Sequence, residues 1–304
     1  MRELSQRVTV AIEASKADVG VVIRHVESAQ EVAHRADVPV PLASVVKVPV
    51  LVEAFHQIRT GTLALDEQLE LDADVKALGS GVLTLLDDGL SLTVRDLLTL
   101  MTVISDNTAT DLLMRRLGID AIAGRMRRLG LAGIHVVHTI GEIFADMLPS
   151  ADPDQDRAAL AAWEAANGVR RDGFAYSLGP DNNVGTPRDM ARLLEMIVTG
   201  VALDRQGCDA MLDILHAQQL RDRLPRFLPP GVRMAHKTGT FSGIRNDCGV
   251  ISGEEGRGHV VIAMLTSWDH SAVRNDPRAD RRRAQQIDDC FGEIGLAAYE
   301  TFFA

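Results

Sequence analysis

Lysine is scarce in this sequence. Only four of the 32 basic residues are lysines, at positions 16, 47, 76 and 237, and the rest are arginines. Acidic residues are more numerous, at 42, so the formal net charge is −10. Nucleic acids and anionic membrane surfaces bind clustered positive charge, and we therefore expect neither of them as a partner.

Cysteine is also rare, with three widely separated residues: Cys208, Cys248 and Cys290. An odd number without a Cys-x-x-Cys pair argues against a disulfide framework and a zinc site, so we expect three buried thiols. His135 and His138 form a His-x-x-His string, but no third ligand signal accompanies them. We therefore expect no metal and no cofactor.

Long apolar runs are absent as well. No stretch reaches the roughly 18 residues that a membrane-spanning helix requires. The first 20 residues contain acidic side chains and lack the continuous apolar segment of a secretory signal. We therefore expect a cytoplasmic protein, or a periplasmic or secreted one only if a leader has been removed.

Strand patterns occur near both ends of the chain. A β-branched run over 19–26 predicts a buried strand, and residues 31–35 are its expected hairpin partner. Three further strands are expected over 232–238, 244–252 and 258–267, with short loops that favour antiparallel pairing. Helical patterns fill most of the remainder, over 3–16, 44–59, 94–101, 108–117, 120–129, 156–166, 187–199, 204–219 and 279–303.

These patterns predict an α/β protein of the three-layer α+β type. Its antiparallel sheet is formed by both ends of the chain and is flanked by helices, and an all-helical subdomain is inserted between them. We expect an α/β sheet domain from residues 1–42 and 187–304, and a helical subdomain from residues 43–186.

Two of the four lysines stand in short strings with chemical meaning. In Ser44-Val45-Val46-Lys47 the serine lies at the start of a predicted helix, near the positive end of the helix dipole. Lys47 follows one turn later on the same face, so its amine can reach the hydroxyl. Desolvation lowers the pKa of a lysine, and a neutral amine activates a serine. We therefore expect Ser44 as nucleophile and Lys47 as its base.

The second string, Ser105-Asp106-Asn107, falls at a junction between predicted helices. The Ser105 hydroxyl can shuttle a proton to a leaving group, and the Asn107 amide can pair with a substrate amide. We expect Asp106 to point inward and hold the turn.

The third string, Lys237-Thr238-Gly239-Thr240, falls at the end of the predicted strand 232–238. Lys237 and Thr238 suit a substrate carboxylate, and Gly239 allows a substrate backbone to approach closely. The N–H groups of Thr240 and Ser44 are a candidate oxyanion hole. The expected partner is a small-molecule amide or lactam that carries a carboxylate.

Together the three strings resemble the class A serine β-lactamases, within the wider penicillin-recognising serine hydrolases. The resemblance covers nearly the whole chain and implies an acyl-enzyme on Ser44. It also implies proton relay through Ser105 and a carboxylate held with the help of Lys237. Three more segments resemble parts of that family: Gly79-Ser80-Gly81-Val82-Leu83, the run from Arg223 to Gly231, and Thr186-Pro187-Arg188-Asp189-Met190-Ala191.

The resemblance fails in one region. Class A enzymes carry a glutamate in an Ω-loop Glu-x-x-x-Asn string, which activates the water that hydrolyses the acyl-enzyme, and residues 130–186 have no such string. An ungapped reading places Ile140 at the glutamate position and Phe144 at the asparagine position. Glu142 is two residues away and is a candidate if the loop shifts, whereas Glu164 has the wrong spacing.

The same region is longer than the family pattern by roughly 25–30 residues, which suggests a functional loop or lid. Tyr176 is a candidate to reach the site from this lid, and an anchoring core tyrosine is the alternative. Arg245, on the strand after the third string, is a candidate for the substrate carboxylate, with a surface ion pair as the alternative.

Three functions stay open at this point. The first is a β-lactamase that completes turnover. The second is a cytosolic amidase or esterase with the same nucleophile and another substrate, which the altered Ω-loop region and the missing signal peptide favour. The third is a penicilloyl-serine binding or sensing module, which stays acylated because no base activates water. The natural substrate, the deacylating residue and the oligomeric state also stay open.

Overall fold

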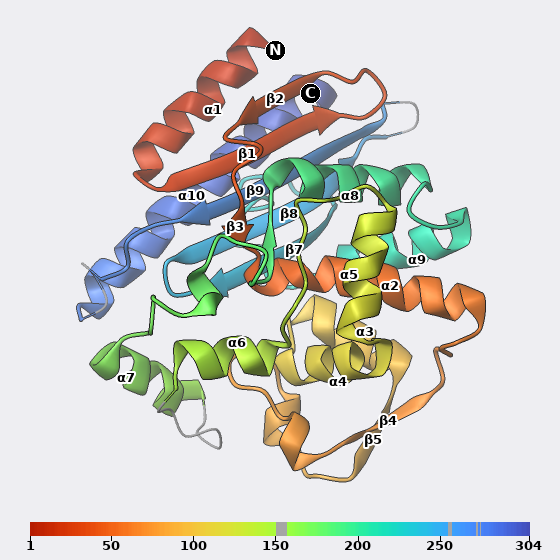
Figure 1. Cartoon of the computed structure of the whole chain (residues 1–304). Coiled ribbons are helices and arrows are strands. Elements are labelled where there is room, and N and C mark those ends of the chain that lie inside the picture. Colours follow the sequence, from red (N-terminus) through yellow and green to blue (C-terminus); the bar gives the residue numbers. More distant parts are fainter. Residues whose placement is uncertain (150–156, 255–256, 272, 274) are drawn as a thin grey trace.

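A computed structural model describes the chain except for residues 150–156, 255–256, 272 and 274 (Figure 1). Its main sheet has the strand order β2-β1-β9-β8-β7, and each neighbouring pair is antiparallel. The expected sheet from both ends of the chain is therefore confirmed. The strands are β1 (Asp18–His25), β2 (Glu31–His34), β7 (Met234–Phe241), β8 (Ile244–Ser252) and β9 (His259–Ser267).

Helices cover both faces of this sheet. One face packs against α1 (Arg2–Ser15) and α10 (Pro277–Phe303), and the other against α8 (Pro187–Thr199) and α9 (Arg205–His216). Successive strand residues alternate between the two layers: Ile262 and Met264 join the α1/α10 side, and Val261 joins the α8 side. Because both faces of the sheet are buried, the residues on both sides of each strand are apolar. The strand sequences therefore read as continuous apolar runs. The three-layer class is confirmed.

The inserted helical part begins and ends at one short ladder. There β3 (Val40–Pro41) pairs antiparallel with β6 (Val184–Gly185), beside the expected boundaries at 42 and 186. In Figure 1 both chain ends lie near α1 and β2, and the inserted helices lie on the opposite side of the molecule. The inserted helices are α2 (Lys47–Thr60), α3 (Val94–Val103), α4 (Asn107–Leu117), α5 (Ile119–Arg128), α6 (Ile140–Met147) and α7 (Arg157–Asn167).

Helix α2 is the centre of this inserted part. Its residues from Lys47 to Phe55 are all buried, so the helix has no polar face along its first half. A helix that is buried all round must be surrounded by other elements, and α2 packs against α4, α5 and α9. The candidate base Lys47 is therefore the first residue of a helix whose first half is completely buried.

Several elements differ from the expectations. The helix expected from Ser44 begins as a 3₁₀ turn, η1 (Ala43–Val46), and α9 ends three residues before the expected 219. Strand β7 continues to Phe241, so the third string lies inside a strand and not at its end. The elements that were not expected are α6, β3, β6, β4 (Gln68–Leu71), β5 (Leu90–Thr93), η2 (Ala73–Val75), η3 (Leu83–Leu85) and η4 (Phe174–Tyr176).

Two composition-based expectations bear on the rest of the molecule. All three cysteines are free and buried, as expected. Within the described residues, no helix combines the length and the apolar character needed to cross a membrane.

Candidate active site

Ser44 lies in the η1 turn, and a residue of strand β8 holds this turn in place. The Asn246 amide on β8 donates to the carbonyls of Pro41, at 2.9 Å, and Leu42, at 3.0 Å, and the residue is fully buried. Ala43, directly before the serine, has a φ of 47°, which non-glycine residues rarely adopt. Such a conformation persists only where its surroundings hold it, and Asn246 supplies that support.

Strand β7 packs against the same turn at Gly239. A Cβ added to Gly239 would lie 2.6 Å from the Leu42 carbonyl oxygen and 3.1 Å from the Ser44 nitrogen. Only glycine permits so close an approach. This close contact is with the η1 turn of Ser44, and an approach of substrate to Gly239 stays a prediction. The third string is thereby held next to Ser44.

Lys47 connects the first string to the second. Its amine donates to the Ser105 carbonyl (2.8 Å), to Ser105 Oγ (3.0 Å) and to Asn107 Oδ1 (2.8 Å). Burial lowers the pKa of Lys47 to about 7, although Asp106 and Asp111 act in the opposite direction. Within the described residues, no hydrogen bond joins this amine to the Ser44 hydroxyl. An amine with a pKa near neutrality thus lies one turn from the serine, and its role as the base stays a prediction.

Lys237 connects the third string to the same hydroxyl. Its amine donates to Ser105 Oγ and to the Thr238 carbonyl, each at 3.0 Å, and it is fully buried. Burial and the neighbouring Lys47 lower the pKa of Lys237 well below its usual range. Ser105 itself has a φ of 61°, a second rare conformation at this site. All three strings therefore meet at Ser105.

Asp106 holds the turn of the second string, as expected. Its carboxylate accepts from the N–H of Ala109 (2.9 Å), Val82 (2.7 Å) and Leu83 (3.0 Å). It is also the N-cap of α4, so that helix begins one residue earlier than expected. Asn107, the first helical residue, donates its side-chain amide to the Leu78 carbonyl at 2.7 Å. Pairing of this amide with a substrate stays a prediction.

A small chamber of about 30 Å³ opens at Ser44. Its polar lining includes Asn107, Thr240 and two asparagines that precede β6, Asn182 and Asn183. Its apolar wall is formed by Ile140, Ile143, Phe144 and Phe241. Among the described residues, no carboxylate lines this chamber.

Glu142 faces away from the chamber because it caps α6. Its carboxylate accepts from the Thr139 N–H at 2.8 Å, and the Thr139 hydroxyl accepts from the Glu142 N–H at 3.2 Å. This capping box leaves the Glu142 side chain 56% exposed, in a different pocket that Asp111 and Arg115 also line. A role in deacylation would require α6 to rotate or unwind, and it stays a prediction.

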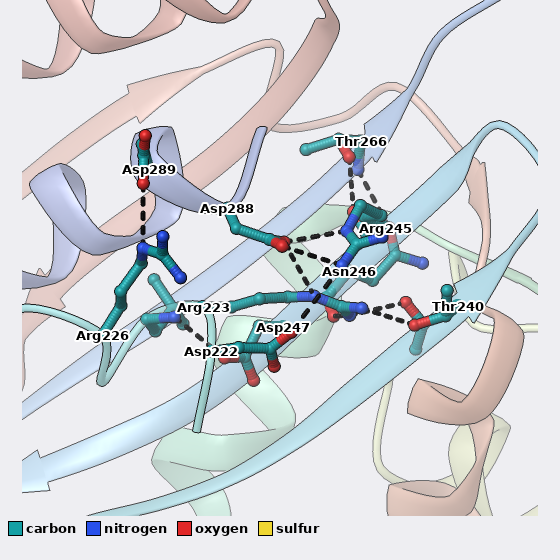
Figure 2. Close-up of polar contacts among 12 residues, drawn as sticks. Asp222, Arg223, Arg226, Thr240, Arg245, Asn246, Asp247, Thr266, Asp288 and Asp289 are labelled. Carbon is teal, nitrogen blue, oxygen red and sulfur yellow. Dashed lines mark hydrogen bonds and ion pairs between the residues drawn. The ribbon is translucent and has the colours of Figure 1, made fainter. Parts of the chain in front are cut away.

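Arg223 is a residue that the sequence did not single out for the site. It is buried, and its guanidinium donates to the Gly239 carbonyl (2.8 Å), the Asn246 carbonyl (2.6 Å) and the Thr240 hydroxyl. Figure 2 shows it reaching along the sheet from Asp288 toward Thr240. Arg223 thus ties the third string to the strand that supports the nucleophile turn. Its one sequence signal was its place at the start of the family-like run from Arg223 to Gly231, which gave it no role.

Arg245 and Tyr176 both have partners inside the protein. Two nitrogens of the Arg245 guanidinium lie 2.8 Å from the two carboxylate oxygens of Asp288 on α10 (Figure 2). The Tyr176 hydroxyl donates to the Ser242 carbonyl at 2.9 Å, and its ring meets Phe241 edge-on. Tyr176 therefore braces the turn after β7. Binding of substrate by Arg245, Tyr176 or Thr238 stays a prediction.

Residues 3–302 match the family model described as the Beta-lactamase enzyme family. The chain belongs to this family. Its fold is accordingly the serine hydrolase fold that the three strings led us to expect.

Individual relatives carry different functions in their names. The β-lactamase regulatory protein BlaB of Streptomyces cacaoi is 27% identical over 263 residues, which cover 81% of this chain and 83% of BlaB. A β-lactamase from Sphaerobacter thermophilus has a TM-score of 0.77 at 29% identity, covering 98% of this chain and 96% of its own. A PBP-A variant, solved as an acyl-enzyme complex with penicillin G, has a TM-score of 0.75 at 23% identity, with 99% and 97% covered. The PBP-A likeness concerns the fold alone.

Proposed function

We propose that this protein forms an acyl-enzyme on Ser44 with β-lactams or related amides that carry a carboxylate, and that it releases the acyl group slowly. The observation that carries the proposal is the apolar wall of Ile140, Ile143 and Phe144 over the serine, with no carboxylate among the described lining residues. Hydrolysis of an acyl-enzyme needs a base that activates water. A penicilloyl-binding or sensing role therefore fits this site better than rapid turnover.

Acylation uses groups that lie beside the serine. Ser44 Oγ attacks the amide carbon, and its proton passes to the neutral amine of Lys47. The resulting oxyanion is stabilised by the N–H groups of Ser44 and Thr240. Its collapse breaks the C–N bond, and the leaving nitrogen takes the hydroxyl proton of Ser105. The Lys47 ammonium, 3.0 Å from Ser105 Oγ, then returns a proton to Ser105.

Substrate binding uses the outer side of β7. This strand is at the edge of the sheet, so half of its backbone N–H and C=O groups face away from β8. A substrate amide can pair with these groups as an added strand. The buried Arg223 guanidinium lies beside this strand and favours a carboxylate on the substrate, and the Lys237 amine, on β7 itself, can donate a hydrogen bond to it.

The relatives support both parts of the proposal, the acylation of Ser44 and the slow release of the acyl group. A PBP-A variant of the same fold is described as an acyl-enzyme complex with penicillin G, and BlaB is described as a regulatory protein. Formation of a lasting adduct is the chemistry that a β-lactam sensor needs. The structural neighbour from Sphaerobacter thermophilus is described as a β-lactamase. Complete hydrolysis of the β-lactam is therefore the competing outcome that the experiment must distinguish from a lasting adduct.

Time-resolved intact-protein mass spectrometry tests this proposal. The full chain is mixed with a penicillin, a cephalosporin or p-nitrophenyl acetate. A lasting adduct of one penicillin on Ser44 supports it, whereas a transient adduct with product release indicates a β-lactamase. Reaction with p-nitrophenyl acetate alone indicates an amidase or esterase with another substrate. Ser44→Ala should lose every adduct, and Ser80→Ala, at another lining serine, should keep them.

A further inference from the structure

A second and larger cavity adjoins the Ser44 chamber. Its volume is about 380 Å³, and Thr240 and Phe241 line both spaces. The chamber at Ser44, about 30 Å³, is less than a tenth of that volume. It holds little more than the reacting bond, so the greater part of a bound substrate lies outside it. The adjoining cavity is of the size that small ligands occupy.

The enlarged region of the chain builds one wall of this cavity. Glu164 of α7 and Arg171 of the following loop line it on one side. The other sides are lined by Ser242 of the turn between β7 and β8, His270 of the loop after β9 and Asp280 near the start of α10. The cavity therefore exists because of the segment in which this chain departs from the class A pattern.

Arg171 is fixed in this wall without a carboxylate partner. Its guanidinium donates to the Ser242 carbonyl at 3.3 Å and stacks on the Tyr176 ring, 4.8 Å from the ring centroid. It also covers Gly243, whose φ is +75° and where a Cβ would lie 2.5 Å from the guanidinium. In the described part of the chain no carboxylate oxygen comes within 4.0 Å of Arg171.

Glu164 is an acidic group in the same cavity that, like Arg171, has no ion-pair partner among the described residues. Burial raises the pKa of its carboxyl, and none of the ion pairs between described residues includes it. The other charged groups of the cavity are already paired, because His270 binds Asp280 at 2.9 Å and Arg245 binds Asp288 at 2.8 Å. One guanidinium and one carboxyl group thus lack an ion partner in the same cavity.

Trp268 adds an aromatic surface to this wall. The residue lines the cavity and is 8% exposed. Its indole nitrogen is buried away from the open cavity, so the ring offers a ligand an apolar contact.

We propose that this cavity binds the far end of the acyl-donor substrate, and that this end carries an ammonium and a carboxylate group together, as a free α-amino acid does. The carboxylate pairs with Arg171, and the ammonium pairs with Glu164. A neutral end group leaves both protein charges unpaired. The inference rests on the proposed function, because the other end of the same molecule acylates Ser44.

Three cephalosporins that differ only in the side-chain end test the inference. The α-aminoadipyl compound carries both charges, the adipyl compound lacks the ammonium, and the 5-aminopentanoyl compound lacks the carboxylate. We expect the first to acylate Ser44 at least tenfold faster than either of the others, measured as second-order rate constants by intact mass. Glu164→Gln should abolish the advantage over the adipyl compound, and Arg171→Gln the advantage over the 5-aminopentanoyl compound.

Two controls separate this inference from the proposed function. p-Nitrophenyl acetate is too short to reach the cavity, so it should acylate the wild type and both variants equally, which also reports correct folding. Asp172→Asn, 91% exposed on the same loop, should keep the preference. Equal rates for the three cephalosporins on a chain that reacts with p-nitrophenyl acetate overturn the inference alone. A Ser44 that reacts with none of these compounds overturns the proposed function and the inference with it.

Discussion

Lys47 and Lys237 place their amine nitrogens at the same distance, 3.0 Å, from one oxygen atom, Ser105 Oγ. Both amines are buried, and two neighbouring buried cations destabilise each other. Burial lowers the pKa of each lysine, and the neighbouring Lys47 further lowers the pKa of Lys237. The site thus obtains a neutral amine near physiological pH by removing that amine from water.

The acylation rate should rise with pH around neutrality. The pKa of Lys47 is about 7, so its neutral fraction increases between about pH 6 and pH 8 and then levels off. Lys47→Arg keeps a cation that does not lose its proton. We expect it to reduce the p-nitrophenyl acetate burst rate by about 10²–10⁴ and to remove the pH dependence.

The matched control for this experiment is Lys76→Arg. Lys76 pairs with Asp88 at 2.7 Å and lies outside the Ser44 chamber, so its burst rate should equal that of the wild type. A wild-type profile that is flat from pH 5.5 to 9 would contradict the assignment of Lys47 as the base.

A carboxylate introduced into the chamber should speed release of the acyl group. Ile140 is buried on the chamber wall as the first residue of α6. In Ile140→Glu we expect the adduct to decay at least tenfold faster than in the wild type, because a general base can then activate water. Ile140→Gln has nearly the same shape but no base, and its adduct should persist. Equal decay in both variants would show that the wall does not control deacylation.

Replacement of the Asn246 amide should lower both the free energy of unfolding and the rate of acylation. Asn246→Asp replaces two N–H donors by a buried carboxylate that faces the carbonyls of Pro41 and Leu42. We expect a loss of about 3 kcal/mol or more in the free energy of unfolding, measured in urea, and a slower burst. Gln285→Glu, exposed on α10, makes the same chemical change with little effect. A stable variant with a normal burst would remove Asn246 from the support of the nucleophile turn.

Asp111 should give the stability a defined pH dependence. Its carboxylate accepts from the N–H groups of Ile140 and Gly141, each at 2.7 Å, and burial raises its pKa from 3.8 to about 6. The folded protein therefore keeps a proton that the unfolded chain releases. The associated stabilisation is complete below about pH 4 and is lost as the pH rises through 6.

This shift corresponds to about 3 kcal/mol. The free energy of unfolding of the wild type, minus that of Asp111→Asn, should fall by up to this amount between about pH 4 and pH 7. Urea titrations at several pH values measure the difference. A difference that is constant over this range would show that folding does not raise the pKa of Asp111.

The sequence predicted the sheet and the helices around Ser44 because their apolar periods are long and both strand faces are buried. It did not predict α6, whose eight residues are too few for a clear period, although the Thr139–Glu142 capping box was readable. That box also explains why Glu142, chosen by its distance in sequence from the expected position, faces solvent. Arg223 was missed because its role arises from contacts with β7 and β8 that no local pattern records.

The position of β1 between β2 and β9 has a consequence for biosynthesis. Strand β1 is synthesised early, but its neighbour β9 emerges from the ribosome only near the end of synthesis. Lys237, the second lysine that contacts Ser105, emerges shortly before β9. A nascent polypeptide on the ribosome therefore carries the serine for most of its synthesis without the strand that completes its site. If the proposed reaction is correct, an antibiotic labels completed molecules and spares unfinished ones.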